Sequence, residues 1–240
     1  MNFLWIGLFS ALVAPLSAAA QTVAERLAVV ELFTSQACSS CPPADAFLGE
    51  LAGRPDVLAL SEHVDYWDYL GWRDPFASRE HTRRQRDYAQ RLGLSYVYTP
   101  QMVVQGALQG SGADRNTVHR LIAEARTLPA VAVGFDRDDT GGLVVRFDSA
   151  VLPEPMDVWL VRFDLRRATT VAKGENGGRQ VVNHNVVRDL TRLASWDGTP
   201  LTLPIADAPG APDDSGTAVL VQHPKTGRII GAARTQSPSH

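Results

Sequence analysis

Both cysteines of the chain lie within four positions, in the segment Cys38-Ser39-Ser40-Cys41. The apolar run 28–33 precedes the pair, and Pro42 follows it at the start of a helix-like segment. Residues i and i+3 face the same way, so the two sulfurs can bond, and the free N–H groups at a helix start favour a thiolate at Cys38. The pattern therefore predicts strand, loop and helix, with Cys38 as the attacking and Cys41 as the resolving sulfur of a redox-active disulfide.

Two other interpretations of the cysteine pair stay open. A structural disulfide that closes a ring of about four residues would contribute only roughly 2 kcal/mol, compared with about 3 kcal/mol for a loop of about 15 residues. A metal site, copper in particular, would need more ligands than two thiolates, and its expected ligands are Cys38, Cys41 and His63. On the redox interpretation the protein needs no cofactor beyond the Cys38–Cys41 disulfide.

The stretch between the cysteines and Pro100 holds the possible accessory residues. The strand-like run 57–65 alternates at its end, which places His63 and Asp65 on one face. The aromatic-rich segment 66–76 follows this strand, and we expect it near the carboxyl edge of the sheet, as we expect the cysteines. The candidates for proton transfer or for the wall of a substrate groove are His63, Asp65, Tyr66 and Trp67. The alternative is that these side chains only pack or stabilise the insertion.

Residues 78–92 predict a helix, with Ser78 as its cap and Gly93 as its stop. Its arginines are interleaved with Glu80 and Asp87, which favours a solvated surface over an anion site.

A proline-initiated strand begins at Thr99-Pro100, and residues 116–126 predict a further helix. The order of strand with Cys-x-x-Cys, helix, strand, helix, Thr-Pro strand, short strand and helix resembles the thioredoxin fold. The resemblance implies that Pro100 is a cis-proline beside the cysteines, preceded by Thr99. It also implies that this backbone positions the extended chain of a substrate, while the proline blocks metal capture by the cysteines.

Over nearly all of the mature chain the sequence also looks like a proteobacterial family of predicted secreted, thioredoxin-like proteins of unassigned function. The motifs that carry this resemblance are Glu31-Leu32-Phe33-Thr34-Ser35-Gln36-Ala37-Cys38-Ser39-Ser40-Cys41-Pro42-Pro43-Ala44-Asp45, His63-Val64-Asp65-Tyr66-Trp67-Asp68, Thr99-Pro100-Gln101 and Asn185-Val186-Val187-Arg188. The resemblance supports a fold more than a reaction. Ser39-Ser40 stands where redox thioredoxins have Gly-Pro, so the motif does not indicate the direction of electron flow.

After Pro129 the pattern changes to short β-like runs separated by turn residues. The expected strands are 130–135, 143–147, 156–164, 169–172, 180–193, 201–204, 217–223 and 229–234. The polar cluster Asn183-His184-Asn185 with Arg188 is interpreted as surface or interdomain structure, and the alternative is that it reaches the cysteine face. The predicted fold class is an α/β thioredoxin-like N-terminal domain with an α-helical insertion, followed by an all-β, sandwich-like C-terminal domain. The predicted divisions are a signal peptide at 1–20, a thioredoxin-like domain at 25–128 with its insertion at about 66–95, and a β-sandwich-like domain at 129–236.

The first 20 residues predict an export signal. The apolar run 3–16 has the length of a signal-peptide core, and Ala18 and Ala20 occupy the small positions of a cleavage site. The run is short for a membrane span, so we expect no transmembrane domain after cleavage and a periplasmic or secreted protein. A disulfide persists in such a compartment.

Composition limits the partners. The 240 residues carry a formal net charge of −3, which argues against nucleic-acid binding. The expected function is an exported thiol–disulfide oxidoreductase that acts on a protein or a small thiol or disulfide. The alternative is a copper-binding or non-catalytic thioredoxin-like interaction protein of the envelope.

Overall fold

The computed structural model describes residues 26–206 and 213–235. Its helices and strands, in chain order, are β1 (Ala28–Thr34), α1 (Pro42–Ala52), β2 (Val57–His63), the 3-10 helix η1 (Asp68–Leu70), α2 (Arg79–Arg91), β3 (Gln101–Val104), β4 (Leu108–Ser111), α3 (Arg115–Ala125), β5 (Val133–Arg137), β6 (Leu143–Phe147), β7 (Met156–Thr170), β8 (Gln180–Trp196), β9 (Leu201–Pro204), β10 (Ser215–Gln222) and β11 (Ile229–Arg234).

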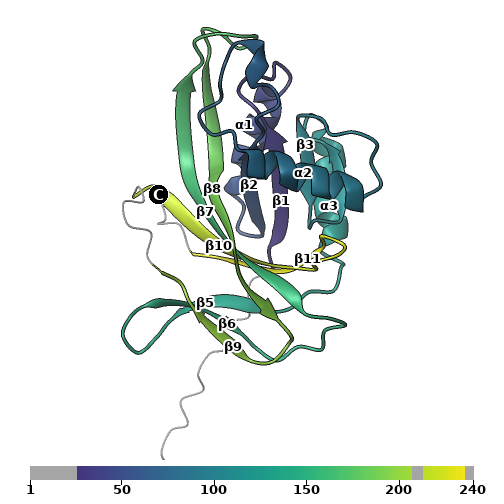
Figure 1. Cartoon of the computed structure of the whole chain (residues 1–240), viewed down its shortest axis with the longest axis vertical. Helices are drawn as coiled ribbons and strands as arrows, with labels where there is room; N and C mark the ends of the chain where they lie inside the picture. Colours follow the sequence, from purple (N-terminus) through teal and green to yellow (C-terminus); the bar gives the residue numbers. More distant parts are fainter. Residues whose placement is uncertain (1–25, 207–212, 236–240) are drawn as a thin grey trace, which may run out of the picture.

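An eight-stranded mixed sheet forms the centre of the molecule, in the order β11-β10-β7-β8-β2-β1-β3-β4 (Figure 1). β1 pairs parallel with β2 and antiparallel with β3. The long hairpin of β7 and β8 joins this group because β8 runs parallel to β2 and pairs with it through Ser61 and Val186. Strands from both halves of the chain therefore share one sheet.

This sheet corrects the predicted fold class. The expectation of an α/β thioredoxin-like N-terminal domain followed by a separate all-β, sandwich-like domain is wrong, because the described chain is mostly β and β7, β8, β10 and β11 extend the sheet of β1 to β4. Strands 156–164 and 169–172 were expected to be separate, but they are one strand of 15 residues. Its charged middle is accommodated because Arg167 pairs with Asp164 and Asp214. The domain divisions at 25–128 and 129–236 stay predictions, and residues 1–20 lie outside the described residues.

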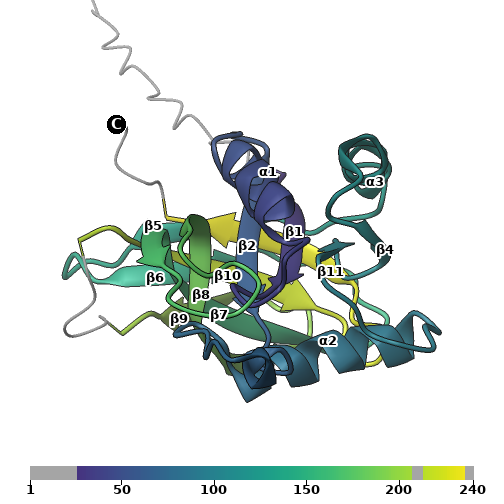
Figure 2. The same ribbon diagram turned by 90° about the horizontal axis from the view of Figure 1, so that it is seen from above.

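Helices cover both faces of the sheet around β1. Figure 2 shows α1 and α3 on one side of the strands and α2 on the other. All seven residues of β1 are buried. Val30 and Leu32 pack in the core with residues of α1 and α3, whereas Phe33 contacts Tyr88 of α2 edge to face, with ring centroids 6.1 Å apart. The apolar run 28–33 is therefore a central strand, for which burial on both faces is typical.

One charged residue, Glu31, interrupts that apolar run and is fully buried. Its carboxylate accepts hydrogen bonds from Nε of Arg84 at 2.6 Å and from the hydroxyl of Tyr88 at 2.6 Å. Glu62 of β2 lies 3.4 Å from the same Nε atom. Burial, followed by the charge of Glu31, raises the pKa of Glu62 well above its usual range. These residues attach α2 to the sheet through a buried ionic cluster.

A second sheet, of order β5-β6-β9, lies below the first in Figure 1. Val145 and Phe147 of β6 share a hydrophobic core with Val158 of β7 and Val219 of β10. The rings of Phe147 and Trp196 lie 5.1 Å apart in this core. The lower part of the β7–β8 hairpin therefore packs on the second sheet, which leaves its upper part free to reach α1.

Helices α1 and α2 begin where the sequence predicts, whereas α3 begins at Arg115, one residue before its predicted start. Pro42 occupies the first turn of α1, where a missing N–H leaves no helical bond unmade. Ser78 caps α2, and its hydroxyl accepts the backbone N–H of Glu80 at 3.0 Å. The expected strands 143–147, 201–204 and 229–234 are confirmed without a shift in their limits. Within residues 26–206 and 213–235, no helix combines the length and apolar character that crossing a membrane requires.

Candidate functional site

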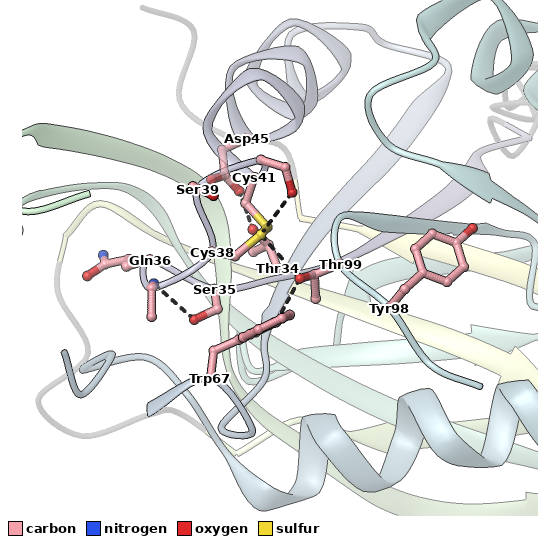
Figure 3. Close-up of a disulfide and its surroundings, with 12 residues drawn as sticks. Thr34, Ser35, Gln36, Cys38, Ser39, Cys41, Asp45, Trp67, Tyr98 and Thr99 are labelled. Carbon is pink, nitrogen blue, oxygen red and sulfur yellow. Dashed lines mark hydrogen bonds between the residues drawn. A yellow bond between two sulfur atoms is a disulfide. The ribbon is translucent and has the colours of Figure 1, made fainter. Parts of the chain in front are cut away.

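The two cysteines form a disulfide at the start of α1, with Cα atoms 5.4 Å apart (Figure 3). Cys41 stands at the N-cap position, and its carbonyl accepts the backbone N–H groups of Ala44 and Asp45. Cys41 is fully buried, whereas Cys38 is 4 % exposed and is followed by the exposed Ser39 and Ser40. The predicted disulfide is confirmed, and its outer sulfur is that of Cys38.

Thr99 and Pro100 lie beside the disulfide. The peptide bond between them is cis. The hydroxyl of Thr99 donates a hydrogen bond to Sγ of Cys38 at 3.2 Å and accepts one from Nε1 of Trp67 at 2.8 Å. The structure therefore brings Cys38, Thr99 and Trp67 together through two consecutive hydrogen bonds, which are drawn as dashed lines in Figure 3.

An acid that the sequence analysis did not single out, Asp45, lies one helical turn after Cys41. Its side chain is 5 % exposed and accepts the hydroxyl of Thr34, at the end of β1, at 2.8 Å. Burial raises the pKa of Asp45 to about 6, while the charge of His63 acts in the opposite direction. The signal for this residue was its spacing, because i and i+4 lie on the same face of a helix.

His63, at the end of β2, pairs with a second buried acid. Its Nδ1 atom lies 2.7 Å from Oδ2 of Asp74, and neither side chain is exposed to solvent. Burial alone would lower the pKa of His63, but the carboxylates of Asp74 and Asp45 raise it above its usual range. Burial would raise the pKa of Asp74, but His63 holds it below its usual range. The Nε2 atom of His63 is buried and has no hydrogen-bond partner among the described residues.

Asp65 and Tyr66 point toward α2 instead. The hydroxyl of Thr82 donates to Oδ1 of Asp65 at 2.6 Å, and the hydroxyl of Tyr66 donates to Gln85 at 3.1 Å. Burial raises the pKa of Tyr66 to about 12, so its hydroxyl stays protonated. Of the four accessory candidates, Trp67 bonds to the residue beside Cys38, His63 couples to Asp45, and Asp65 and Tyr66 connect the insertion to α2.

Aromatic side chains flank Thr99. The rings of Trp67 and Tyr69 are stacked with centroids 6.4 Å apart, and those of Tyr96 and Tyr98 are tilted with centroids 5.9 Å apart. Tyr69 is 77 % exposed and Tyr96 is 69 % exposed. In Figure 3 Trp67 and Tyr98 lie on different sides of Thr99. Tyr69 belongs to the aromatic-rich segment 66–76, whereas Tyr96 and Tyr98 were not among the candidates although they lie just before Thr99 in the sequence.

The loop before Cys38 is fixed by residues from distant strands. Nε2 of Gln36 donates to Oδ1 of Asn183 of β8 at 3.1 Å, and Nε1 of Trp72 donates to Oε1 of Gln36 at 3.1 Å. Asn183 is 1 % exposed and contacts the cysteine loop, so a surface position, one part of the expectation of surface or interdomain structure, is wrong for this residue. The contact agrees with the alternative that this cluster reaches the cysteine face.

The residues proposed for copper are arranged differently from a preformed metal centre. Cys38 and Cys41 are bonded to each other, and His63 is bonded to Asp74. In the described part of the chain, no group of three or more His, Cys, Asp or Glu side chains is placed to hold a metal ion. The copper site of Cys38, Cys41 and His63 stays a prediction.

A cavity of about 490 Å³ lies between α2 and strands β7, β8 and β10. The residues that line it include Arg84, Arg91, Asp157, Trp159, Arg188 and Gln222. Neither cysteine, Thr99 nor Trp67 is among its lining residues. The cavity is therefore separate from the disulfide site.

The chain resembles proteins of known structure. A crystal structure of an Agrobacterium tumefaciens protein shares 34 % identity with it at a TM-score of 0.72, covering 89 % of this chain and 97 % of that one. The structure of HBP35 of Porphyromonas gingivalis matches with a TM-score of 0.58 and 14 % identity, covering 88 % of this chain and 75 % of that one, which is a likeness of fold alone. No curated protein matches the chain. Residues 29–222 match the family described as protein of unknown function (DUF1223). The chain therefore belongs to the DUF1223 family.

Proposed function

We propose that this protein is an exported thiol–disulfide oxidoreductase that acts through the Cys38–Cys41 pair on a protein or small-molecule thiol or disulfide. The observation that carries the proposal is the hydrogen bond from Thr99 to Sγ of Cys38, because it stabilises the sulfur that must carry negative charge. The support from thioredoxin-like proteins is limited to this site, where a Cys-x-x-Cys disulfide lies beside a cis-proline, and does not extend to the fold of the whole chain.

Cys38 is the attacking sulfur in this proposal. When the pair is reduced, the Cys38 thiolate attacks one sulfur of a substrate disulfide, a mixed disulfide forms, and the first substrate sulfur leaves as a thiolate that takes up a proton. Cys41 then loses its proton and attacks Cys38, which releases the second substrate thiol and closes the Cys38–Cys41 bond. Two electrons pass from the cysteine pair to the substrate. In the opposite direction the same steps oxidise a substrate dithiol.

The depth of the two sulfurs supports this order. Cys38 adjoins the exposed Ser39 and Ser40, whereas Cys41 is fully buried. A substrate disulfide therefore reaches Cys38 first. The free N–H groups at the start of α1 favour a thiolate at Cys38.

Asp45 is the proposed proton acceptor for Cys41. It lies on the same helical face, and the pKa of its carboxyl is raised to about 6 by burial, so the carboxyl can exchange a proton near neutral pH. The charge of His63 lowers the pKa of Asp45, and the charge of Asp74 raises it. The accessory role proposed for His63 thus acts through Asp45.

Redox titration tests the proposed function. Purified mature protein is equilibrated with mixtures of reduced and oxidised glutathione, and the free thiols are trapped and counted by mass spectrometry. We expect a reversible two-electron transition that is absent from the Cys38→Ser/Cys41→Ser double variant. A disulfide that is reduced only when the protein unfolds, as followed by circular dichroism in the same samples, would overturn the proposal.

A further inference from the structure

The turn that connects β7 and β8, residues 171–179, reaches the cysteine loop from the other half of the chain, and we call it the hairpin tip. Its own backbone bonds hold it in shape: Gly177 N–H donates to the Gly174 carbonyl at 3.0 Å, and Gly178 N–H donates to the Val171 carbonyl at 2.8 Å. Gly174 has a φ of +77° and packs close to the backbone of Leu70. The hairpin tip therefore has its own hydrogen-bonded conformation and packs against the segment that contains Leu70.

Asn176 joins the hairpin tip to the cysteine loop. Its side chain is fully buried, and its Nδ2 donates to the carbonyl of Gln36 at 3.0 Å and to the carbonyl of Cys38 at 2.9 Å. These contacts bridge residues 138 and 140 positions apart. One amide thus holds the backbone on both sides of Ala37, including that of Cys38 itself.

Glu175, the preceding residue, places a carboxylate beside Cys38. Its Oε2 accepts the backbone N–H of Ser39 at 3.3 Å, and its side chain is exposed. Buried charged side chains around the cysteine loop include Asp45 of α1, His63 at the end of β2 and Asp74 of the segment after η1. The guanidinium of Arg179, at the end of the hairpin tip, donates to Oδ1 of Asn176 at 3.4 Å. A carboxylate at the amide next to Cys38 opposes negative charge on that sulfur and occupies an N–H group that could stabilise it.

We propose that the hairpin tip sets the balance between the disulfide and dithiol forms: Asn176 fixes the tip against the cysteine loop, and Glu175 disfavours the Cys38 thiolate. This inference rests on the proposed redox function and adds residues of the second half of the chain to its site. Both are positioning residues, since neither exchanges electrons with the substrate. The arrangement shifts the pair toward the disulfide and makes the reduced protein a better electron donor.

The test compares Glu175→Gln with wild type in the glutathione titration at pH 8, where free thiols ionise appreciably. We expect the equilibrium constant for reduction of the disulfide by glutathione to rise about two- to fivefold, the size of a single exposed charge interaction. The increase should shrink in 1 M NaCl because salt screens an exposed charge. Glu124→Gln removes the same charge from the exposed face of α3 and should leave the constant unchanged.

Asn176→Ala tests the anchor. In that background the Glu175→Gln change should lose at least half of its effect, because the carboxylate is no longer held at Ser39. If Asn176→Ala does not fold, the single Glu175→Gln variant still decides the role of Glu175, since its side chain is exposed. A wild-type protein that equilibrates with glutathione while Glu175→Gln behaves like Glu124→Gln would overturn this inference alone. A wild-type protein that never equilibrates would overturn the proposed function as well.

Discussion

Thr99 donates its hydroxyl to Sγ of Cys38 across 61 positions of sequence, at a distance of 3.2 Å. The donor itself is oriented by Nε1 of Trp67 at 2.8 Å. A side chain from the turn before β3 therefore bonds to the sulfur of Cys38, in the loop before α1, and a side chain from the segment after β2 orients it. Because this contact polarises one sulfur and not the other, it distinguishes the roles of the two cysteines.

Thr99→Val should slow the reaction of Cys38 with iodoacetamide. Valine keeps the shape of threonine but removes the hydroxyl, so the thiolate loses one hydrogen bond and the rate at pH 7 should fall about tenfold. Thr99→Ser keeps the donor and should react within about twofold of wild type. Rates are measured on the reduced proteins by mass spectrometry. Equal rates for Thr99→Val and Thr99→Ser would show that the hydroxyl does not act on the sulfur.

Asp45→Asn should change how stability depends on pH. The folded protein keeps Asp45 protonated up to a pKa of about 6, whereas the unfolded chain loses that proton near pH 3.8, so ionisation of Asp45 makes wild type less stable as pH rises through this window. A shift of about two units corresponds to about 3 kcal/mol. Asp45→Asn should therefore gain up to about 3 kcal/mol relative to wild type between pH 4 and pH 7.

Urea denaturation at both pH values measures this difference. Asp56→Asn is the control, because the Arg54 side chain lowers the pKa of Asp56 and the window therefore differs. The gain of Asp45→Asn over wild type should grow with pH. A gain that stays constant from pH 4 to pH 7 would show that Asp45 is not the titrating group.

Arg84→Met should destabilise the protein by about 3–5 kcal/mol, because it leaves the buried Glu31 carboxylate without its cation. Glu62 already has no hydrogen-bond partner for either carboxylate oxygen within the described residues. Adding Glu31→Gln to Arg84→Met should recover part of the loss, since the buried carboxylate that lost its cation is then replaced by a neutral amide. Arg86→Met, on the exposed face of the same helix, should change stability by less than about 0.5 kcal/mol. Urea denaturation of the three variants separates these outcomes, and an unchanged midpoint for Arg84→Met would contradict the role of the cluster.

Gly106→Ala should cost at least about 3 kcal/mol, because the position combines a left-handed backbone with a close contact. Its φ is +60°, and a Cβ atom there would clash with the carbonyl oxygen of Gly227 in the turn between β10 and β11. Gly134→Ala is the comparison, since a Cβ at that strand position meets nothing within 4 Å. Thermal unfolding should separate the two variants clearly. Equal melting temperatures would mean that the close approach of the two turns is not a constraint on the fold.

Local signals were sufficient for the elements that rest on capping and turn residues. Ser78 and Pro42 each mark a helix start by chemistry within the first turn, and the strand 143–147 is bounded by glycines on one side. The disulfide followed from the spacing of Cys38 and Cys41, and the place of Thr99 beside it followed from the resemblance of the element order to thioredoxin.

Long-range pairing could not be predicted in this way. β8 joins β2 through Ser61 and Val186, and hydrophobic periodicity indicates a strand without indicating its neighbour. For the same reason the sequence offers contact of the Asn183 cluster with the cysteine face as an alternative but does not identify Gln36 as the partner. The sequence does not indicate the burial of Asp45 and Asp74. Charged residues are expected at the surface unless they are paired, and the partners of these two lie on other elements.

Single-cysteine variants test most directly whether Cys38 is the attacking sulfur, because each variant leaves only one sulfur to react. Reduced Cys41→Ser and Cys38→Ser proteins are mixed with oxidised glutathione at pH 7, and the mixed disulfide is followed by mass spectrometry. We predict that Cys41→Ser forms the adduct at Cys38 at least about tenfold faster than Cys38→Ser forms one at Cys41, because Cys38 has the hydroxyl of Thr99 as donor whereas Cys41 is fully buried. Equal rates, or a faster reaction of Cys38→Ser, would contradict the assignment of Cys38 as the attacking sulfur.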